Sequence, residues 1–128
     1  MDDNLELTEL QLDVMRALWA RSEASVSEVH AALQGERGLA LTTVATILTR
    51  LERAGLVARR SEGRHYVYRP LVSEERVRHS MVSGLAERLF NGDVTALVSH
   101  LLAEREIAPG DLARVRRLIE AQEQKPES

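Results

Sequence analysis

Hydrophobic residues recur at helical spacing through most of this chain, and most clearly in residues 41–54 (LTTVATILTRLERA). Val44, Ile47, Leu48 and Leu51 fall at i, i+3, i+4 and i+7, which places them along one side of a helix. The opposite side carries threonines and arginines, with no carboxylate among them. The pattern therefore predicts an amphipathic helix whose outer side consists of hydroxyl and guanidinium groups.

Two shorter helices precede this one, and each begins with a capping signature. Residues 8–11 (TELQ) and 25–28 (SVSE) have the Ser/Thr-x-x-Glu/Gln spacing in which side chain and backbone cap each other. We expect the first helix to reach about Arg21 with Trp19 in the core, and the second to end at Gly35. Three helices, with a short Gly-containing turn between the second and third, are the outline of a helix-turn-helix unit.

After Gly55, which suits the left-handed position that ends a helix, the hydrophobic period changes to two. Residues 56–60 and 65–69 read as two strands joined by a turn at residues 61–64, and Pro70 ends the second strand. This hairpin carries Arg59, Arg60, Arg64 and Arg69. We interpret it as a basic wing. The alternative is a hairpin whose edge charges only prevent aggregation.

Three more amphipathic helices are predicted after the hairpin. Ser73 and Asp93 are placed to cap the first two, Asn91-Gly92 separates them, and Pro109 suits the first turn of the third. Their faces carry too many large apolar side chains to be left exposed to water, so we expect these helices to form a homodimer interface. The predicted dimerisation residues are Val77, Met81, Leu85, Leu89, Leu97, Leu101, Leu112, Val115, Leu118 and Ile119.

These elements define a mainly α protein with a small β-hairpin. We expect a winged helix-turn-helix DNA-binding domain over residues 1–71 and a three-helix dimerisation domain over residues 72–128. Two copies would hold their third helices at a fixed spacing on duplex DNA, one helical turn or a multiple apart.

The charge is unevenly distributed along the chain. The formal net charge is −3, yet residues 36–69 carry seven arginines and three glutamates, whereas residues 1–35 carry two arginines and seven acidic residues. A local basic region in an acidic chain favours a defined nucleic-acid footprint over indiscriminate binding to polyanions.

Several other classes of function are disfavoured by the sequence. The absence of cysteine excludes disulfides and thiolate metal sites, and no apolar run is long enough to cross a membrane. The acidic N-terminus is unlike a signal peptide, so we expect a cytoplasmic protein. The four histidines fall on separate elements, and no catalytic set or nucleotide-binding motif accompanies them. We therefore predict no enzymatic activity, no metal and no cofactor; Glu75 and His79 are interpreted as a surface pair.

The outer side of the third helix is the predicted DNA-binding surface. Hydroxyls and guanidinium groups can donate to phosphate oxygens, and arginine can form paired hydrogen bonds with guanine. The candidate residues are Thr42, Thr43, Ala45, Thr46, Thr49, Arg50 and Arg53 on this helix, with Arg60 and Arg64 on the wing. Two alternatives remain: an ordinary solvated helix face, or a winged-helix module that contacts only proteins.

Four segments carry a resemblance to a known family. They are residues 9–19 (ELQLDVMRALW), 43–51 (TVATILTRL), 62–70 (EGRHYVYRP) and 90–92 (FNG). Together they resemble the penicillinase repressors, also called BlaI/MecI/CopY regulators, from Leu7 to about Glu120. The resemblance implies a winged-helix homodimer that represses transcription from a near-palindromic operator. It also implies that the third helix enters the major groove and that the wing around Arg64 touches the DNA backbone.

The resemblance leaves the inducing signal open. The copper-responsive branch carries a cysteine-rich C-terminal motif, which this chain lacks. In the β-lactam-responsive branch, a membrane-bound sensor-peptidase leads to cleavage at an Asn-Phe bond, and the matching position here is His100-Leu101. The resemblance thus marks His100-Leu101 as a candidate cleavage region. The alternatives are cleavage elsewhere, cleavage by a different peptidase, and no cleavage.

Overall fold

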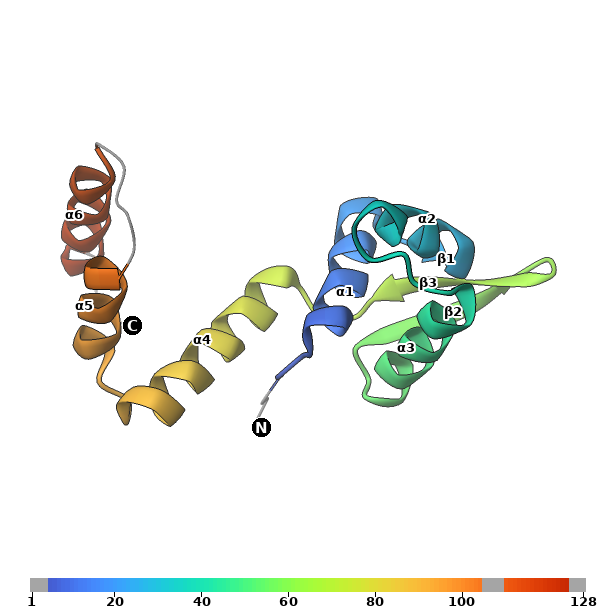
Figure 1. Ribbon diagram of the computed structural model, residues 1–128, viewed down its shortest axis with the longest axis horizontal. Coiled ribbons are helices and arrows are strands. Elements are labelled where there is room, and N and C mark those ends of the chain that lie inside the picture. Colours follow the sequence, from blue (N-terminus) through green and yellow to red (C-terminus); the bar gives the residue numbers. More distant parts are fainter. Residues whose placement is uncertain (1–4, 105–109, 125–128) are drawn as a thin grey trace. The chain divides into compact units, whose positions relative to one another are not determined.

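A computed structural model describes residues 5–104 and 110–124. Figure 1 labels its elements. In chain order they are α1 (Glu9–Arg21), β1 (Ala24–Ser25), α2 (Val26–Arg37), α3 (Leu41–Arg53), β2 (Val57–Glu62), β3 (His65–Pro70), α4 (Glu74–Phe90), α5 (Val94–Glu104) and α6 (Asp111–Glu123). The chain divides into two compact units, Met1–Leu85 and Ala86–Ser128. The predicted fold class, mainly α with a small β-hairpin, is confirmed.

Both predicted capping boxes are present. The Thr8 hydroxyl accepts a hydrogen bond from the Gln11 backbone N–H, and the Gln11 side chain accepts one from the Thr8 N–H. Ser25 and Glu28 cap α2 in the same reciprocal way. The hydrogen bond from the Ser25 backbone N–H also lowers the pKa of Glu28, because it stabilises the carboxylate. These caps fix the starts of α1 and α2 from local sequence alone.

The predicted end of α2 at Gly35 is wrong. The helix continues to Arg37 and ends at Gly38, whose φ of 61° is left-handed. The N–H of Gly38 donates to the Gln34 carbonyl, so the later glycine closes the last turn. At the end of α3 the prediction is confirmed, because Gly55 has a φ of 82°.

The sheet has three strands rather than the two expected, in the order β1-β3-β2, and all pairings are antiparallel. The unpredicted strand β1 has only two residues; it pairs Ala24 with Tyr68 and Ser25 with Val67. Strand β2 extends two residues further than expected, to Glu62, which pairs with His65; β3 begins at His65 as expected and includes Pro70, which pairs with Val57. The turn between them needs Gly63 in the left-handed region, with a φ of 64°. The wing is therefore longer than its sequence pattern indicated, and β1 attaches its base to the start of α2.

The core of the first unit is built on the apolar side of α3. The four residues that define this side, Val44, Ile47, Leu48 and Leu51, are all buried. They lie in one cluster with buried residues of α1, α2 and the sheet. Trp19 packs against this cluster and donates its indole N–H to the Val72 carbonyl at 2.8 Å, as expected of a tryptophan at the edge of a core. With its apolar side buried, α3 presents the opposite side outward.

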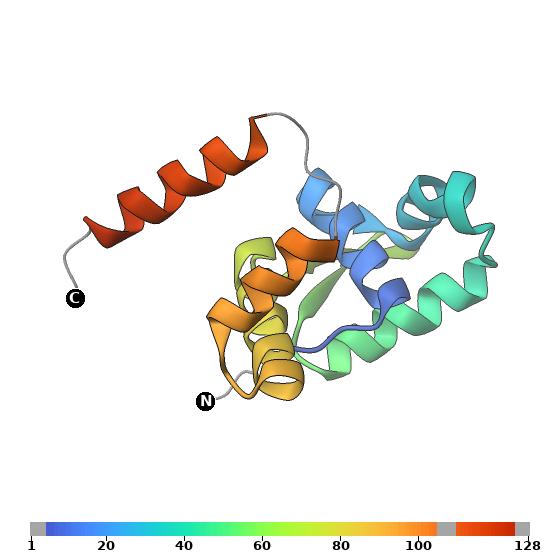
Figure 2. The same ribbon diagram turned by 60° about the vertical axis from the view of Figure 1, so that its left-hand side comes forward.

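The helix α4 continues from the first unit into the second. Ser73 caps its first turn by accepting from the Arg76 N–H, as predicted. It ends at Phe90, and Asn91 and Gly92 after it both have positive φ. Asp93 then caps α5 by accepting from the Ala96 N–H. Figure 2 shows this short turn between α4 and α5. Pro109, the expected start of the last helix, lies outside the described residues.

No helix among the described residues combines the length and the apolar character that crossing a bilayer requires.

Candidate nucleic-acid interface

The outer side of α3 is accessible to a macromolecular ligand. Thr42, Thr46, Arg50 and Arg53 are exposed. The flanking positions Thr43, Ala45 and Thr49 are half-buried. Burial of Thr46 and Arg50 would have excluded α3 as a DNA-reading helix, and neither is buried.

Two of the threonine hydroxyls are already used as hydrogen-bond donors. Thr46 Oγ1 donates to the Thr42 carbonyl and Thr49 Oγ1 to the Ala45 carbonyl, each at 3.0 Å. A hydroxyl has one proton and two lone pairs, so these groups offer a ligand an acceptor and a methyl group. The sequence-based expectation that they donate to phosphates does not apply to this arrangement. It suits exocyclic amino groups and thymine methyls on base edges instead.

The arginines of α3 carry charge that carboxylates do not neutralise. Arg50 and Arg53 lie in the last turn of the helix, where a positive charge also opposes the helix dipole. Within the described part of the chain, no carboxylate lies within ion-pair distance of either guanidinium group. Both side chains are therefore available to an anionic or hydrogen-bond-accepting partner.

Arg59, at the base of the wing, connects the hairpin to α3. Its Nε lies 3.2 Å from a carboxylate oxygen of Glu52, and its guanidinium carbon lies 4.1 Å from the centre of the Tyr66 ring. The pKa of Arg59 is raised, mainly by interaction with the Tyr68 hydroxyl and to a smaller extent by the nearby negative charge of Glu52. The exposed Arg59 side chain therefore links the wing to Glu52 in the last turn of α3.

Arg60, a predicted DNA contact, is held by two carboxylates. Its guanidinium group donates to Glu23, in the connection after α1, and to Glu62, two residues further along β2, at 2.9 Å in each case. These hydrogen bonds raise the pKa of Arg60, and the bond to Glu23 contributes most. The cluster of Glu23, Arg60 and Glu62 has a formal charge of −1. The sequence could not show this neutralisation because Glu23 is distant from Arg60 along the chain.

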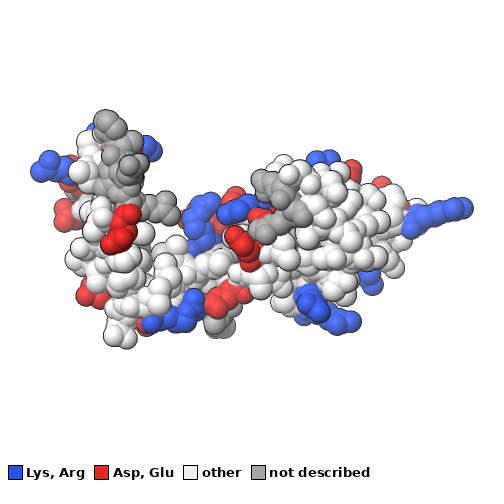
Figure 3. All heavy atoms as spheres, in the orientation of Figure 1, with Lys and Arg blue, Asp and Glu red and all other residues white. Residues whose placement is uncertain are grey.

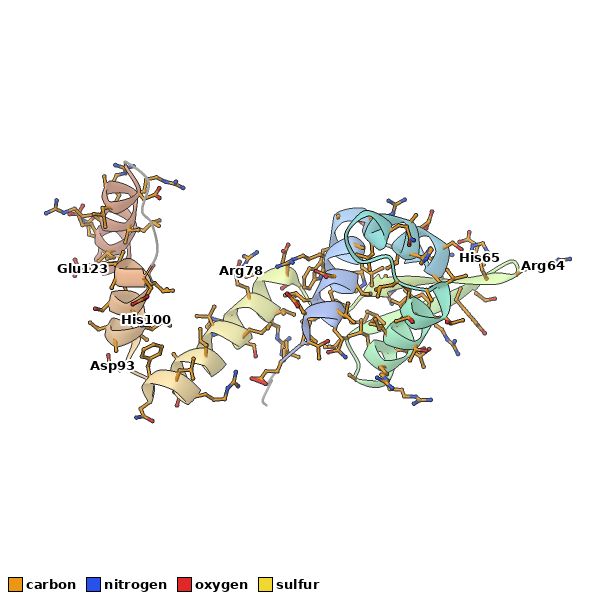
Figure 4. All side chains as sticks on the ribbon, in the orientation of Figure 1. Arg64, His65, Arg78, Asp93, His100 and Glu123 are labelled. Atoms are coloured by element: carbon orange, nitrogen blue, oxygen red, sulfur yellow. The ribbon has the colours of Figure 1, made fainter. Side chains whose placement is uncertain are left out.

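Arg64 occupies the turn at the end of the wing. Figure 4 shows its side chain pointing outward from the tip, beyond His65. In Figure 3, basic side chains project from the end of the hairpin and from the edge of the first unit where α3 lies. No ion pair to Arg64 is found among the described residues, so the wing tip presents a full positive charge.

The predicted dimerisation residues fall into two groups. Val77 is 1% exposed in the core of the first unit and Leu97 is 7% exposed, so both are buried within their own chain. Most of the others remain accessible, including Leu89, Leu101, Leu112, Leu118 and Ile119, whereas Met81, Leu85 and Val115 are half-buried. An open groove lined by Val94, Thr95, Val98, Ser99, Leu102, Ala103 and Ile119 adds apolar surface in the second unit.

The candidate cleavage region lies within a regular helix. His100 and Leu101 are both exposed on α5. The His100 ring lies 6.0 Å from that of Phe90, at an interplanar angle of 56°, a contact that sequence reasoning missed. Because a peptidase binds an extended backbone, cutting this bond requires local unwinding of α5.

The histidines are not assembled into a metal or catalytic site in the described part of the chain. His30 is bound through a ring nitrogen to the Leu39 carbonyl at 2.8 Å, next to the turn before α3. Glu75 and His79 are exposed on α4, and no group of three metal-ligating side chains occurs among the described residues.

The fold and the exposed side of α3 define a winged helix-turn-helix protein with a helical C-terminal region. A family model described as penicillinase repressor matches residues 7–121. Because this match covers most of the sequence, the chain belongs to the penicillinase repressor family, and the resemblance identified from the sequence is confirmed.

Individual relatives agree with this assignment. The transcriptional regulator BlaI of Mycobacterium tuberculosis is 38% identical over 98 residues, covering 75% of this chain and 71% of the relative. The methicillin resistance regulatory protein MecI of Mammaliicoccus sciuri is 20% identical over 114 residues, covering 89% of this chain and 93% of the relative. The solution structure of Bacillus licheniformis BlaI in its monomeric form, in complex with the blaP half-operator, is 29% identical. It has a TM-score of 0.50 and covers 59% of this chain and 92% of the other. The names of the MecI and M. tuberculosis BlaI relatives describe regulatory proteins.

Proposed function

We propose that this protein represses transcription by binding a near-palindromic operator as a homodimer. It is a DNA-binding repressor of the penicillinase repressor family. In this proposal α3 enters the major groove, where an α-helix fits, and the wing tip contacts the phosphate backbone. Residues 1–71 bind DNA and residues 72–128 dimerise. The protein acts in the cytoplasm without a cofactor and has no enzymatic activity.

One observation carries the proposal. Thr46, Arg50 and Arg53 are exposed together on the side of α3 that faces away from the core. The arginines supply charge for phosphate or guanine, and the threonine supplies an acceptor and a methyl group for other base edges. A winged helix that contacts only proteins would require neither unneutralised arginines on this helix nor one at the wing tip.

The exposed apolar residues of the second unit support dimerisation. Leu89, Leu118 and Ile119 are each more than half exposed in the single chain. Apolar surface of this kind is costly to leave in water, and a second copy bearing the same surface can bury it. A dimer would also double the number of arginines on one DNA molecule, which raises affinity for a symmetric operator.

The salt dependence of DNA binding tests the proposed function. Affinity should be measured on a duplex covering the region upstream of the protein's own gene, over an approximately fourfold range of salt concentration. The logarithm of the association constant should fall with a slope of about −0.9 per neutralised phosphate. A scrambled duplex of the same length is the control. Equal affinity for the two duplexes, or no dependence on salt, would favour the protein-interaction alternative.

The inducing signal remains a separate proposal. A membrane-bound sensor-peptidase is a candidate partner, with His100-Leu101 as the candidate cleavage region. Because this bond lies inside α5, its cleavage should be slow in the intact protein and faster where α5 is destabilised. Mass spectrometry of the protein from induced cells would locate any cut.

A further inference from the structure

A half-enclosed pocket lies between α1 and the first half of α4, within the first unit. Its volume is about 160 Å³, and its wall consists of Leu12 and Trp19 from α1 with Val77, Met81 and Val82 from α4. Arg16, Glu74 and Arg78 stand around it. None of these side chains belongs to the DNA-facing side of α3. Val77 is buried in the core of the first unit, and Met81, a predicted dimerisation residue, is half-buried beside the pocket.

The size and lining of the pocket suit an aromatic ring. A cavity of roughly 150 Å³ lined by apolar side chains is large enough to hold benzene. The indole N–H of Trp19 already donates to the Val72 carbonyl, so the ring offers the pocket only apolar and stacking contacts. The Met81 thioether adds a polarisable group that contacts aromatic rings favourably.

Two arginines, Arg16 and Arg78, stand beside the pocket and can bind an anion. Glu74 also lines the pocket, and two further carboxylates, Asp13 and Glu75, lie beside the guanidinium groups outside the lining. Arg16 lies 3.5 Å from Asp13, and Arg78 lies 3.4 Å from Glu74 and 3.7 Å from Glu75. Strong charge-assisted hydrogen bonds measure about 2.7–2.9 Å. The intramolecular pairs are looser than this and both arginines are well exposed, so a ligand carboxylate can compete for them.

We propose that this pocket is an effector site for a small aromatic carboxylate, with the ring between Trp19 and Met81 and the carboxylate at Arg16 and Arg78. The pocket joins α1, which packs on α2 and α3, to α4, which continues into the second unit. A ligand wedged between α1 and α4 therefore acts on the helix that connects the DNA-binding and proposed dimerisation regions. The effect on DNA rests on the proposed function, whereas ligand binding does not.

Trp19 provides a direct assay because it is the only tryptophan in the chain. The full-length protein is titrated with benzoate, and with benzyl alcohol as a neutral probe of similar size, while tryptophan emission is recorded. Isothermal titration calorimetry supplies a second readout that is free of optical artefacts. Benzoate should give a saturable change and bind about tenfold more tightly than benzyl alcohol, because only benzoate carries the charge that the arginines hold.

Variants separate the pocket from general effects on the protein. Val82→Phe fills the pocket and should abolish benzoate binding, whereas Ala32→Phe places a phenylalanine at an exposed position of α2, away from the pocket, and should leave binding intact. Arg78→Ala should weaken benzoate about tenfold and leave benzyl alcohol unaffected. Circular dichroism and thermal unfolding establish that each variant is folded.

Several outcomes would overturn the site. They are no saturable response to benzoate, equal affinity for the two probes, or unchanged binding by Val82→Phe. If a second copy of the chain occupies the pocket, the dimer will not respond to benzoate, and this also rejects the proposal.

The regulatory effect is tested on operator DNA with and without saturating benzoate. A change in operator affinity that Val82→Phe removes supports an effector role. Ligand binding without such a change rejects the effector role, whereas failure of the unliganded protein to bind its operator contradicts the proposed function and leaves the Trp19 titration interpretable.

Discussion

Arginine side chains of the same formal charge occupy two different environments in the first unit. Arg59 and Arg60 are held by carboxylates of their own chain, whereas Arg50 and Arg64 are not. A count of basic residues does not distinguish these arginines, but their surroundings do. An arginine already bound to two carboxylates gains less binding free energy from a phosphate than an arginine bound only to water.

Arg50 should contribute to the reading of bases. Because its guanidinium group is exposed on the outer side of α3 without a carboxylate partner, Arg50→Ala should cost about 1–3 kcal/mol of operator binding if it contacts a base. Electrophoretic mobility shifts or fluorescence anisotropy would measure the loss. Arg114→Ala, on exposed α6, is the control. Unchanged operator affinity in Arg50→Ala would reject the role.

The two wing arginines should behave differently when replaced. Arg64→Ala should weaken binding to all duplexes similarly and reduce the magnitude of the salt slope by about one, as expected for a phosphate contact. Arg60→Ala should have a smaller effect because Glu23 and Glu62 already neutralise that side chain. Glu62→Gln should partly release Arg60 and raise the affinity. A larger loss for Arg60→Ala than for Arg64→Ala would contradict this assignment.

Sequence patterns predicted the helices of the first unit because their determinants are local. The caps at Thr8 and Ser25 and the apolar stripe of α3 depend on residues a few positions apart. The strand β1 was missed because its two residues are ordered by pairing with β3, more than forty positions away. The pairing of Glu23 with Arg60 was missed for the same reason, and so the charge of the wing was overestimated.

Two glycines of neighbouring elements should respond to alanine in opposite directions. Gly35 lies inside α2 with open space around it, so Gly35→Ala should stabilise the protein by about 0.5–1 kcal/mol. Gly55 also has open space but a φ of 82°, so Gly55→Ala should destabilise it by about 1–2 kcal/mol. Urea unfolding at one protein concentration would measure both. Destabilisation by Gly35→Ala would show that α2 does not pass through this residue.

For the whole molecule, the second unit buries too little of its own apolar surface to be self-sufficient. Within the described residues of this unit, the buried hydrophobic side chains are Ala86 and Leu97. Sequence periodicity identified these helices as apolar. It could not distinguish residues such as Val77, which the chain buries itself, from those available to a partner, because that distinction depends on tertiary packing.

Charge placed on α6 should separate the proposed dimer. Leu118 is 69% exposed and Ile119 is 51% exposed in the single chain. The double change Leu118→Glu with Ile119→Glu should therefore reduce the folding stability of a single chain little, but should strongly destabilise a dimer whose interface buries these positions. Analytical ultracentrifugation should show a shift to the monomer mass, accompanied by weaker operator binding. Leu71→Glu, at an exposed leucine of the first unit, should remain dimeric. A double variant that stays dimeric would exclude α6 from the interface.

The carboxylates around Arg60 also bear on how such a protein would search a chromosome. A repressor meets on the order of a million or more unrelated sites for each operator, and electrostatic attraction to any duplex holds it at those sites. With Arg59 and Arg60 engaged by Glu52, Glu23 and Glu62, that indiscriminate attraction is reduced. We therefore expect a larger share of molecules to stay free to reach the operator. The same glutamates that lower the absolute strength of binding would thereby shorten the time to silence a gene.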